Sequence, residues 1–229
     1  MTEENATIGG VKVTISRPDN PTGVTFLLPG SMIPLSEYKT TKNVLLGKNQ
    51  WVLSFYINVM WPPCNNHLAQ VNKVRRVFEA FREIHPQLPN CYNVVGHSVG
   101  AKVALLLRAL PDNSEVLTCI ALDPVDQNPA EFTNTDGAGN LSIPCADPCA
   151  VTMTLTNGGK GISMAHNAWA IHGRNPKTFL VRHEDAGHLA YTDNGGGTIA
   201  RMAIPDIGSK EGNEAARNGA HQLIRKLIS

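Results

Sequence analysis

CYNVVGHSVGAKVALLLRAL, residues 91–110, is the stretch that decides the fold. A short apolar run, residues 91–95, leads into Gly96-His97-Ser98-Val99-Gly100, and a strongly helical run follows until Pro111. Proline ends a helix because it lacks a backbone N–H and its ring clashes with the preceding turn. The stretch therefore predicts a strand that turns sharply into a helix, with a serine on the turn.

The same alternation of strand and helix continues in both directions from this stretch. Apolar runs and alternating patterns predict further strands at residues 11–16, 24–28, 51–57, 116–122, 151–156 and 178–181. Helical periodicity or helix boundary signals, with Ser36 as the expected cap of the first helix, predict helices at residues 36–47, 67–84 and 211–228.

This alternation indicates the α/β class, with a mostly parallel central sheet of about seven strands and helices on both faces. The 229 residues suit one domain, residues 1–229. Two segments rich in Gly, Pro, Asn and Asp, residues 125–149 and 192–210, are expected to be loops over the carboxyl edge of the sheet.

Composition argues against several classes of function. The formal net charge is +1 with no basic stripe, so we expect no nucleic-acid partner. No run of about 18 apolar residues is present, so no membrane span is expected. The N-terminal residues Met-Thr-Glu-Glu-Asn resemble neither a secretory signal nor a transit peptide.

The five cysteines do not form the pattern of a disulfide framework or of a metal site. Cys91 and Cys119 fall in strand-like runs and are expected to be buried thiols. Cys145 and Cys149 can form a disulfide if the loop between them bends suitably. As half of a zinc site they lack a second Cys/His pair, so we expect no metal and no other cofactor.

Ser98 is the candidate nucleophile because its surroundings match the G-x-S-x-G turn between a strand and a helix. The residues two positions away on either side must be small, and Gly96 and Gly100 meet that demand. Such a turn lifts the hydroxyl clear of the sheet and places it at a helix N-terminus, which favours developing negative charge. His97 is expected to point away from the reacting centre and to hold the turn.

A serine hydroxyl needs a general base, and His188 is the favoured candidate. In this class of sheet the base lies on a loop after the last strand, and only His183 and His188 follow residues 178–181 closely. His183 is almost within the strand, whereas His188 follows Gly187, which lets the loop bend toward the serine.

The acid that orients the base is expected to be Asp123. The segment after residues 151–156 is the common place for this acid, but no Asp or Glu occurs between Asp147 and Glu184. Asp123 directly follows the preceding strand, and Pro124 stiffens its turn. Asp126, Asp147 and Asp185 are the alternatives.

Two backbone donors must stabilise the oxyanion of an acyl-transfer reaction. One is expected to be the N–H of Val99, directly after the nucleophile. The other is expected from the loop after residues 24–28, where Gly30 permits a sharp turn and either Ser31 or Met32 supplies the N–H.

Three motifs carry a resemblance to a known family. Gly-His-Ser-Val-Gly-Ala-Lys at 96–102, Ala-Leu-Asp-Pro-Val-Asp at 121–126 and Ala-Gly-His-Leu-Ala-Tyr-Thr-Asp at 186–193 resemble chlorophyllases and related small α/β-hydrolases. The family has a second glycine where this chain has Ala101, and many relatives have His-Gly where it has Pro29-Gly30. The resemblance implies the α/β-hydrolase fold and hydrolysis of a carboxylic ester by Ser98, Asp123 and His188.

The resemblance further implies a hydrophobic ester substrate of the chlorophyll type and suggests a plastid location. A wide apolar mouth for such an ester is expected from residues that are otherwise core or lid residues: Met32, Ile33, Leu35, Trp61, Pro62, Met164 and Trp169. Lipases, thioesterases and polyester hydrolases use the same scaffold, and a non-catalytic small-molecule binder is the alternative from another class.

Overall fold

The computed structural model describes residues 1–57, 67–110, 114–126, 132, 149–155, 163–204 and 207–229. Eight strands form one sheet in the order β1-β2-β4-β3-β5-β6-β7-β8. The first two strands are antiparallel to their neighbours and the other pairs are parallel. The strands are β1 (Thr2–Ile8), β2 (Val11–Arg17), β3 (Gly23–Leu28), β4 (Gln50–Ser54), β5 (Tyr92–His97), β6 (Val116–Leu122), β7 (Cys149–Leu155) and β8 (Phe179–Glu184).

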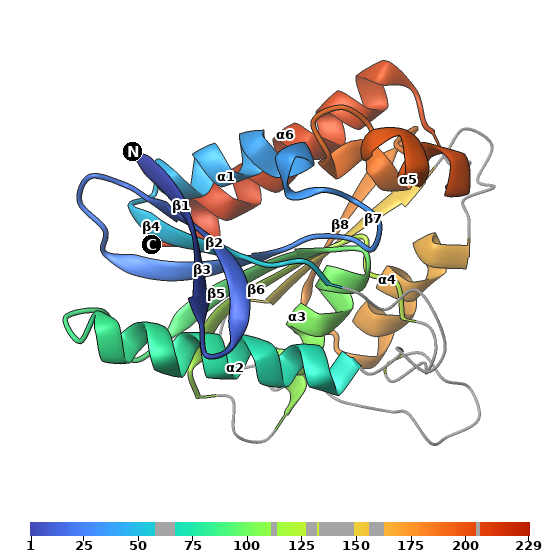
Figure 1. The fold of residues 1–229 in the computed structure, drawn as a ribbon. Coiled ribbons are helices and arrows are strands. Elements are labelled where there is room, and N and C mark those ends of the chain that lie inside the picture. Colours follow the sequence, from blue (N-terminus) through green and yellow to red (C-terminus); the bar gives the residue numbers. More distant parts are fainter. Residues whose placement is uncertain (58–66, 111–113, 127–131, 133–148, 156–162, 205–206) are drawn as a thin grey trace.

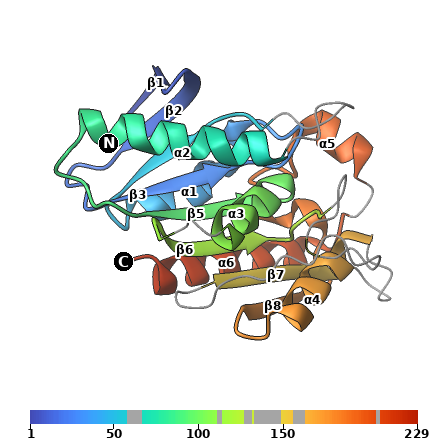
Figure 2. The same ribbon diagram turned by 90° about the horizontal axis from the view of Figure 1, so that it is seen from below.

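Helices cover both faces of this sheet (Figure 1). Helices α2, α3 and α4 pack on one face, where α2 and α3 lie in front of the strands in Figure 2, while α1 and α6 pack together on the other. The helical segments are η1 (Leu35–Tyr38), α1 (Lys39–Leu46), α2 (His67–Ile84), α3 (Val99–Ala109), α4 (Ser163–Arg174), η2 (His188–Tyr191), α5 (Gly197–Ala203) and α6 (Lys210–Leu227). The prediction of a mostly parallel sheet with helices on both faces is confirmed.

Three local predictions were incomplete or wrong. The eighth strand, β1, escapes the apolar pattern because Thr2–Ile8 is a largely exposed edge strand, joined to β2 by Gly9 and Gly10 at positive φ. The predicted helix 36–47 begins as the 3-10 turn η1, and Ser36 is not its cap. The predicted loop 192–210 contains α5, and most of the predicted loop 125–149 lies outside the described residues.

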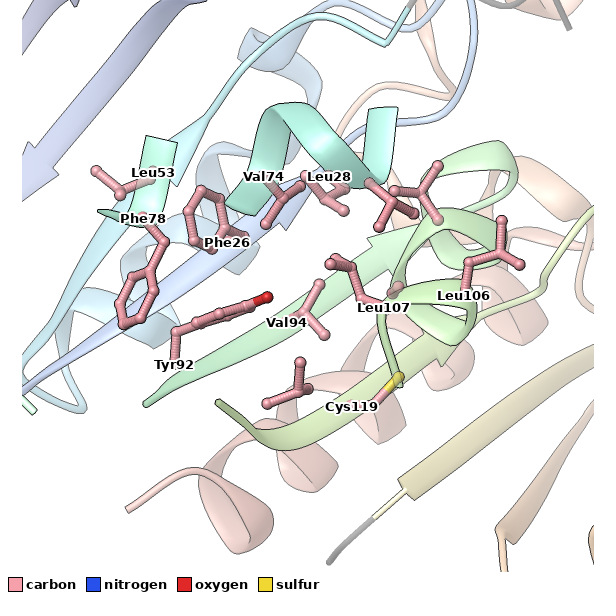
Figure 3. Close-up of a cluster of buried hydrophobic side chains, with 14 of the residues drawn as sticks. Phe26, Leu28, Leu53, Val74, Phe78, Tyr92, Val94, Leu106, Leu107 and Cys119 are labelled. Carbon is pink, nitrogen blue, oxygen red and sulfur yellow. The ribbon is translucent and has the colours of Figure 1, made fainter. Parts of the chain in front are cut away.

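The core between the sheet and α2 and α3 is built from large apolar side chains (Figure 3). The Tyr92 ring packs on Phe26, with centroids 5.2 Å apart, and on Phe78, with centroids 4.5 Å apart. Burial of each such side chain stabilises the fold by about 1.5–3 kcal/mol before entropy is counted. This core holds β3, β5 and α3 in place, and therefore the turn between β5 and α3.

The parallel register brings the carboxyl ends of the central strands level with one another. Leu28 of β3 pairs with Gly96 of β5, His97 of β5 pairs with Leu122 of β6, and Leu122 pairs with Thr152 of β7. Neighbouring strands lie about 4.8 Å apart, so segments that follow these strands meet at one edge.

A buried ion pair joins two of those segments. Lys102 Nζ on α3 lies 3.2 Å from Asp126 Oδ1, with both side chains fully buried. The other Asp126 oxygen accepts a hydrogen bond of 2.8 Å from the Phe132 N–H. The pair therefore ties the first turn of α3, just after Ser98, to the turn that follows β6, just after Asp123.

Replacing Lys102 alone should destabilise the fold strongly, because it leaves the Asp126 charge buried without its cation. We expect Lys102→Met to lower the free energy of unfolding by about 3–5 kcal/mol. The double variant Lys102→Met/Asp126→Asn should recover more than half of that loss, since the amide oxygen of the introduced asparagine can still accept from the Phe132 N–H. Urea unfolding measures both, and equal losses in the single and double variants would contradict the prediction.

Candidate active site

Ser98 lies on a tight turn between β5 and α3, with φ +58° and ψ −121°. A Cβ at Gly96 would lie 2.2 Å from the Gly100 carbonyl oxygen, and one at Gly100 would lie 2.3 Å from that of Leu28. Real Cβ atoms cannot come so close to backbone, which is the physical reason for both glycines. A non-glycine residue in such a conformation stores about 1–3 kcal/mol of strain, and this strain is common at active sites.

The backbone of this turn is fastened to the end of β6. The Ser98 N–H donates to the Leu122 carbonyl over 3.0 Å, and the Val125 N–H donates to the Ser98 carbonyl over 3.2 Å. Asp123 therefore sits on the segment that is bonded directly to the serine turn.

Strand β7 orients the Asp123 carboxylate, although β7 carries no acid of its own. Thr154 donates to it twice, from its N–H (3.1 Å) and from its hydroxyl (2.9 Å), while the Asp123 N–H donates to Thr152 Oγ1 over 3.1 Å. Asp123 is also held at positive φ, +45°. Thr152 and Thr154 are two residues apart, so they lie on the same face of β7, next to the acid.

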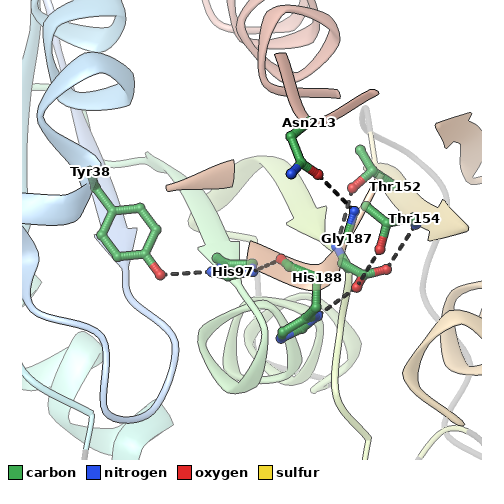
Figure 4. Close-up of polar contacts among 8 residues, drawn as sticks. Tyr38, His97, Thr152, Thr154, Gly187, His188 and Asn213 are labelled. Atoms are coloured by element: carbon green, nitrogen blue, oxygen red, sulfur yellow. Dashed lines mark hydrogen bonds and ion pairs between the residues drawn. The ribbon is translucent and has the colours of Figure 1, made fainter. Parts of the chain in front are cut away.

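His188 contacts the same Asp123 carboxylate that Thr154 binds (Figure 4). Its Nδ1 lies 2.5 Å from Asp123 Oδ2, and both side chains are about 1% exposed. The loop before it is pinned by Asn213 of α6, whose Oδ1 accepts from the Gly187 N–H over 2.8 Å. The structure thus brings Asp123 and His188 together in a buried, charge-assisted contact.

Ser98 and His188 are not hydrogen-bonded to each other. His188 Nε2 is buried and has no hydrogen-bond partner among the described residues. Ser98 Oγ likewise forms no hydrogen bond to another described residue. The ring of His97, beside Ser98, lies 4.8 Å from the His188 ring. Contacts between a nucleophile and its base are often loose without substrate and tighten when it binds.

The alternative candidates have other partners. His183 lies in β8 against the backbone of Gly219 and the ring of Tyr191, and burial lowers its pKa. Asp126 pairs with Lys102, and Asp185 lies at φ +57° with its carbonyl bonded to Ser209. Asp147 is outside the described residues.

The loop after β3 passes directly beside Ser98. A Cβ at Gly30 would lie 3.1 Å from the Ser98 Cβ, and the Gly30 N–H donates to the Tyr38 hydroxyl over 2.9 Å. Met32 is at φ +63°. Within the described residues, the N–H groups of Ser31, Met32 and Val99 form no hydrogen bond, so both alternatives for the second oxyanion donor stay open.

Sequence reasoning missed four residues around the site, namely Tyr38, Thr152, Thr154 and Asn213. The alternation in residues 151–156 marks both threonines as facing one side, but only the pairing of β6 with β7 reveals what they face. Tyr38 and Asn213 carry no signal in the sequence.

The residues expected at an apolar mouth are dispersed. Ile33 is fully buried in the core with Tyr38, which agrees with the alternative of a core residue, whereas Trp169 on α4 is 55% exposed. Met32 and Leu35 are half-buried. Trp61, Pro62 and the side chain of Met164 lie outside what the structure describes.

The cysteines that the structure describes are free thiols. Cys119 is buried as expected, Cys91 is half-buried, and Cys149 pairs in register with Cys119 across β6 and β7. Cys145 is outside the described residues. Within the described part of the chain, no group of three or more His, Cys, Asp or Glu residues is arranged to hold a metal ion, and each helix is too short or too polar to cross a bilayer.

Comparison with solved structures identifies the fold. No protein-family model matches the sequence, and no curated protein matches it either. A dienelactone hydrolase from Anabaena variabilis ATCC 29413 is similar over 100% of this chain and 99% of its own, with a TM-score of 0.66 and 12% identity. The esterase domain of a Rhodothermus marinus protein is similar over 100% of both chains, with a TM-score of 0.61 and 12% identity.

An esterase from Pyrococcus furiosus is similar over 100% of this chain and 94% of its own, with a TM-score of 0.59 and 13% identity. The chain therefore has the α/β-hydrolase fold. These structural neighbours are esterases and dienelactone hydrolases, and at such identity the likeness establishes the fold alone.

The buried histidine beside the serine gives a pH prediction for stability. Burial, and then the neighbouring His188 imidazole, hold the pKa of His97 well below its ordinary value of 6.5. Below pH 6.5 the unfolded chain gains a proton at His97 that the folded chain does not, so stability is lost as the pH falls.

Between pH 6.5 and 5, the free energy of unfolding of the wild type should therefore fall faster than that of His97→Gln. The difference should approach about 1.4 kcal/mol per pH unit. Urea unfolding at several pH values measures it, and parallel slopes would show that His97 is not buried in its neutral form.

Proposed function

We propose that this protein is a serine hydrolase of carboxylic esters, with Ser98 as nucleophile, His188 as general base and Asp123 as the acid that orients the base. One observation carries the proposal: a buried His188–Asp123 contact of 2.5 Å is made by the segment whose backbone is hydrogen-bonded to Ser98, a serine on a strained turn at a helix N-terminus. The chain order Ser, Asp, His is that of α/β-hydrolases.

In the first half-reaction, Ser98 Oγ attacks the ester carbonyl carbon while His188 Nε2 takes the hydroxyl proton. With Nδ1 donating to Asp123, the Nε2 of the neutral ring carries the lone pair that this step requires. The carbonyl oxygen becomes an oxyanion, stabilised by the N–H of Val99 and by that of Ser31 or Met32.

Collapse of this intermediate breaks the bond to the alcohol oxygen, which takes the proton from the His188 imidazolium. The acyl group stays on Ser98 Oγ. In the second half-reaction, His188 takes a proton from water, whose oxygen attacks the acyl carbon, and the acid leaves as Ser98 regains its proton. Asp123 stabilises the imidazolium in both halves, and its own position depends on Thr152 and Thr154.

For the substrate class we propose a hydrophobic ester with a long alcohol chain, of the chlorophyll type. The main support is the resemblance of residues 96–102, 121–126 and 186–193 to chlorophyllases. Further support comes from exposed apolar side chains on α4, on α5 and in the segment that follows α5. Those side chains are Trp169, Ile199, Met202 and Ile207, each more than half exposed.

A non-catalytic small-molecule binder is the second candidate, favoured by one observation. Ser98 and His188 are not hydrogen-bonded, and a protein that only binds a ligand has no need of that contact. Reaction with an active-site reagent separates the two candidates, because a fluorophosphonate labels only a serine that is activated.

The central test is Ser98→Ala, which should lower kcat on p-nitrophenyl butyrate by about 10⁴-fold or more. A fluorophosphonate should label the wild type at Ser98 alone. Ser36→Ala, at an exposed serine on η1, is the matched control and should keep both activity and labelling. Folded wild-type protein that neither turns over ester nor takes the label would refute the hydrolase assignment.

The choice of ester is tested on a substrate panel. We expect kcat/KM for p-nitrophenyl esters to differ across acyl lengths from two to sixteen carbons, and chlorophyll to be hydrolysed faster than a triglyceride or an acyl thioester. Each methylene that enters an apolar pocket contributes about 0.8 kcal/mol to binding. A preference for the thioester or the triglyceride would replace the chlorophyll-type substrate while leaving ester hydrolysis in place.

A further inference from the structure

A chain of hydrogen bonds runs behind the candidate active site, from the loop after β3 to the backbone of His188. The Tyr38 hydroxyl accepts from the Gly30 N–H (2.9 Å) and contacts His97 Nδ1 (2.7 Å). His97 Nε2 contacts the His188 carbonyl oxygen over 2.9 Å. Figure 4 shows Tyr38, His97 and His188 in this line, and the first two are each 1% exposed.

The chemistry of the partners fixes the direction of every bond in this chain. A carbonyl oxygen can only accept, so His97 Nε2 carries the hydrogen that points to His188. In a neutral imidazole the other nitrogen, Nδ1, is then an acceptor, so the Tyr38 hydroxyl donates to it. The same hydroxyl accepts from Gly30, whose N–H can only donate.

His97 fills this role only in its neutral form, and its surroundings favour that form. Burial, followed by the nearby His188 imidazole, keeps the pKa of His97 well below its usual range. The groups that face it are the hydroxyl of Tyr38 and the rings of Tyr191 and His188. Burial also raises the pKa of Tyr38, so that its hydroxyl keeps the proton that it donates.

We propose that Tyr38 and His97 are positioning residues that set the oxyanion-binding loop and the base at a fixed separation across Ser98. These two side chains form a hydrogen-bonded relay whose ends bind main-chain atoms, the Gly30 N–H at one end and the His188 carbonyl at the other. It therefore places the neighbouring N–H groups of Ser31 and Met32, and the His188 ring, without touching a substrate. This inference rests on the proposed ester hydrolysis and deepens it.

A second set of contacts from η1 supports the same separation. The Glu37 carboxylate, on the residue before Tyr38, accepts from the N–H groups of Asn194 (2.9 Å) and Gly196 (3.1 Å). The Glu37 carbonyl accepts from the Asp193 N–H over 2.7 Å. η1 thus holds the chain beyond His188 while Tyr38 holds His97, so the two loops cannot shift independently.

A positioning role predicts an effect on the chemical step more than on binding. Misplacing a base or an oxyanion donor by a fraction of an ångström weakens interactions that strengthen in the transition state, which lowers kcat and leaves KM nearly unchanged. Because Tyr38 acts through His97, replacing both residues should lower kcat little more than replacing one of them.

The test measures kcat and KM on p-nitrophenyl butyrate, and the rate of fluorophosphonate labelling, for five variants. These are Tyr38→Phe, His97→Leu, His97→Gln, the double variant Tyr38→Phe/His97→Leu, and the control Tyr92→Phe. Tyr92 is a buried tyrosine at the opposite end of β5 from Ser98, so its variant reports the effect of losing a buried hydroxyl elsewhere.

Tyr38→Phe and His97→Leu should each lower kcat and the labelling rate about 10- to 100-fold, with KM within twofold of wild type. The kcat of the double variant should lie within about threefold of the kcat of the less active single variant. His97→Gln should recover part of the loss, since its amide nitrogen can still donate to the His188 carbonyl. Tyr92→Phe should keep wild-type kcat even where its unfolding midpoint falls.

Losses that multiply in the double variant, a change confined to KM, or a kcat loss of the same size in Tyr92→Phe would each overturn the relay. Unchanged kcat in Tyr38→Phe, in an enzyme whose turnover depends on Ser98, would overturn the relay and leave the proposed function standing. Absence of Ser98-dependent turnover in the wild type would overturn both. If Tyr38→Phe does not fold, the two His97 variants decide: a higher kcat in His97→Gln than in His97→Leu supports the proposal, and equal kcat values overturn it.

Discussion

The close approach of backbone around Ser98 is the constraint on which the rest of the site depends. A Cβ at Gly96 would lie 2.2 Å from the Gly100 carbonyl oxygen, and one at Gly100 would lie 2.3 Å from that of Leu28, so only glycine fits where β3, β5 and α3 meet. At this point Ser98 has a positive φ and precedes the first residue of α3. The loop after β3 passes next to the serine, where a Cβ at Gly30 would lie 3.1 Å from the Ser98 Cβ.

The surroundings of Asp123 illustrate how neighbouring strands contribute to one candidate site. With no carboxylate after β7, the carboxylate comes from the end of β6, and β7 contributes the two threonines that orient it. Asp123 therefore sits at the end of the strand next to Ser98, on a segment that is hydrogen-bonded to the turn of Ser98. The ion pair of Lys102 and Asp126 fastens the same two segments a few residues further on. A hydrolytic site at this edge would thus be positioned by β5, β6 and β7 together.

Much of the architecture could be predicted from local pattern. Buried strands such as Gly23–Leu28 and Val116–Leu122 are nearly continuous apolar runs, each broken by one threonine, and α2 shows its buried face at helical spacing. Strand β1 could not be predicted, because an exposed edge strand needs no apolar alternation, and its only signal is the Gly9-Gly10 turn. Helix α5 is likewise short, and it exposes Ile199 and Met202 while it buries Ala200, so large apolar residues do not mark its buried side.

The sequence by itself determined the serine turn, the order of strands and helices, and the short lists of acids and bases, because each rests on residues adjacent in the chain. Only the tertiary structure decided that Asp123 meets His188 and that Asp126 meets Lys102. It also decided that Tyr38, 59 residues before His97, bonds to it, and that Thr154 faces Asp123. These contacts join segments far apart in sequence, and their partners follow from strand register and layer packing, which no local pattern encodes.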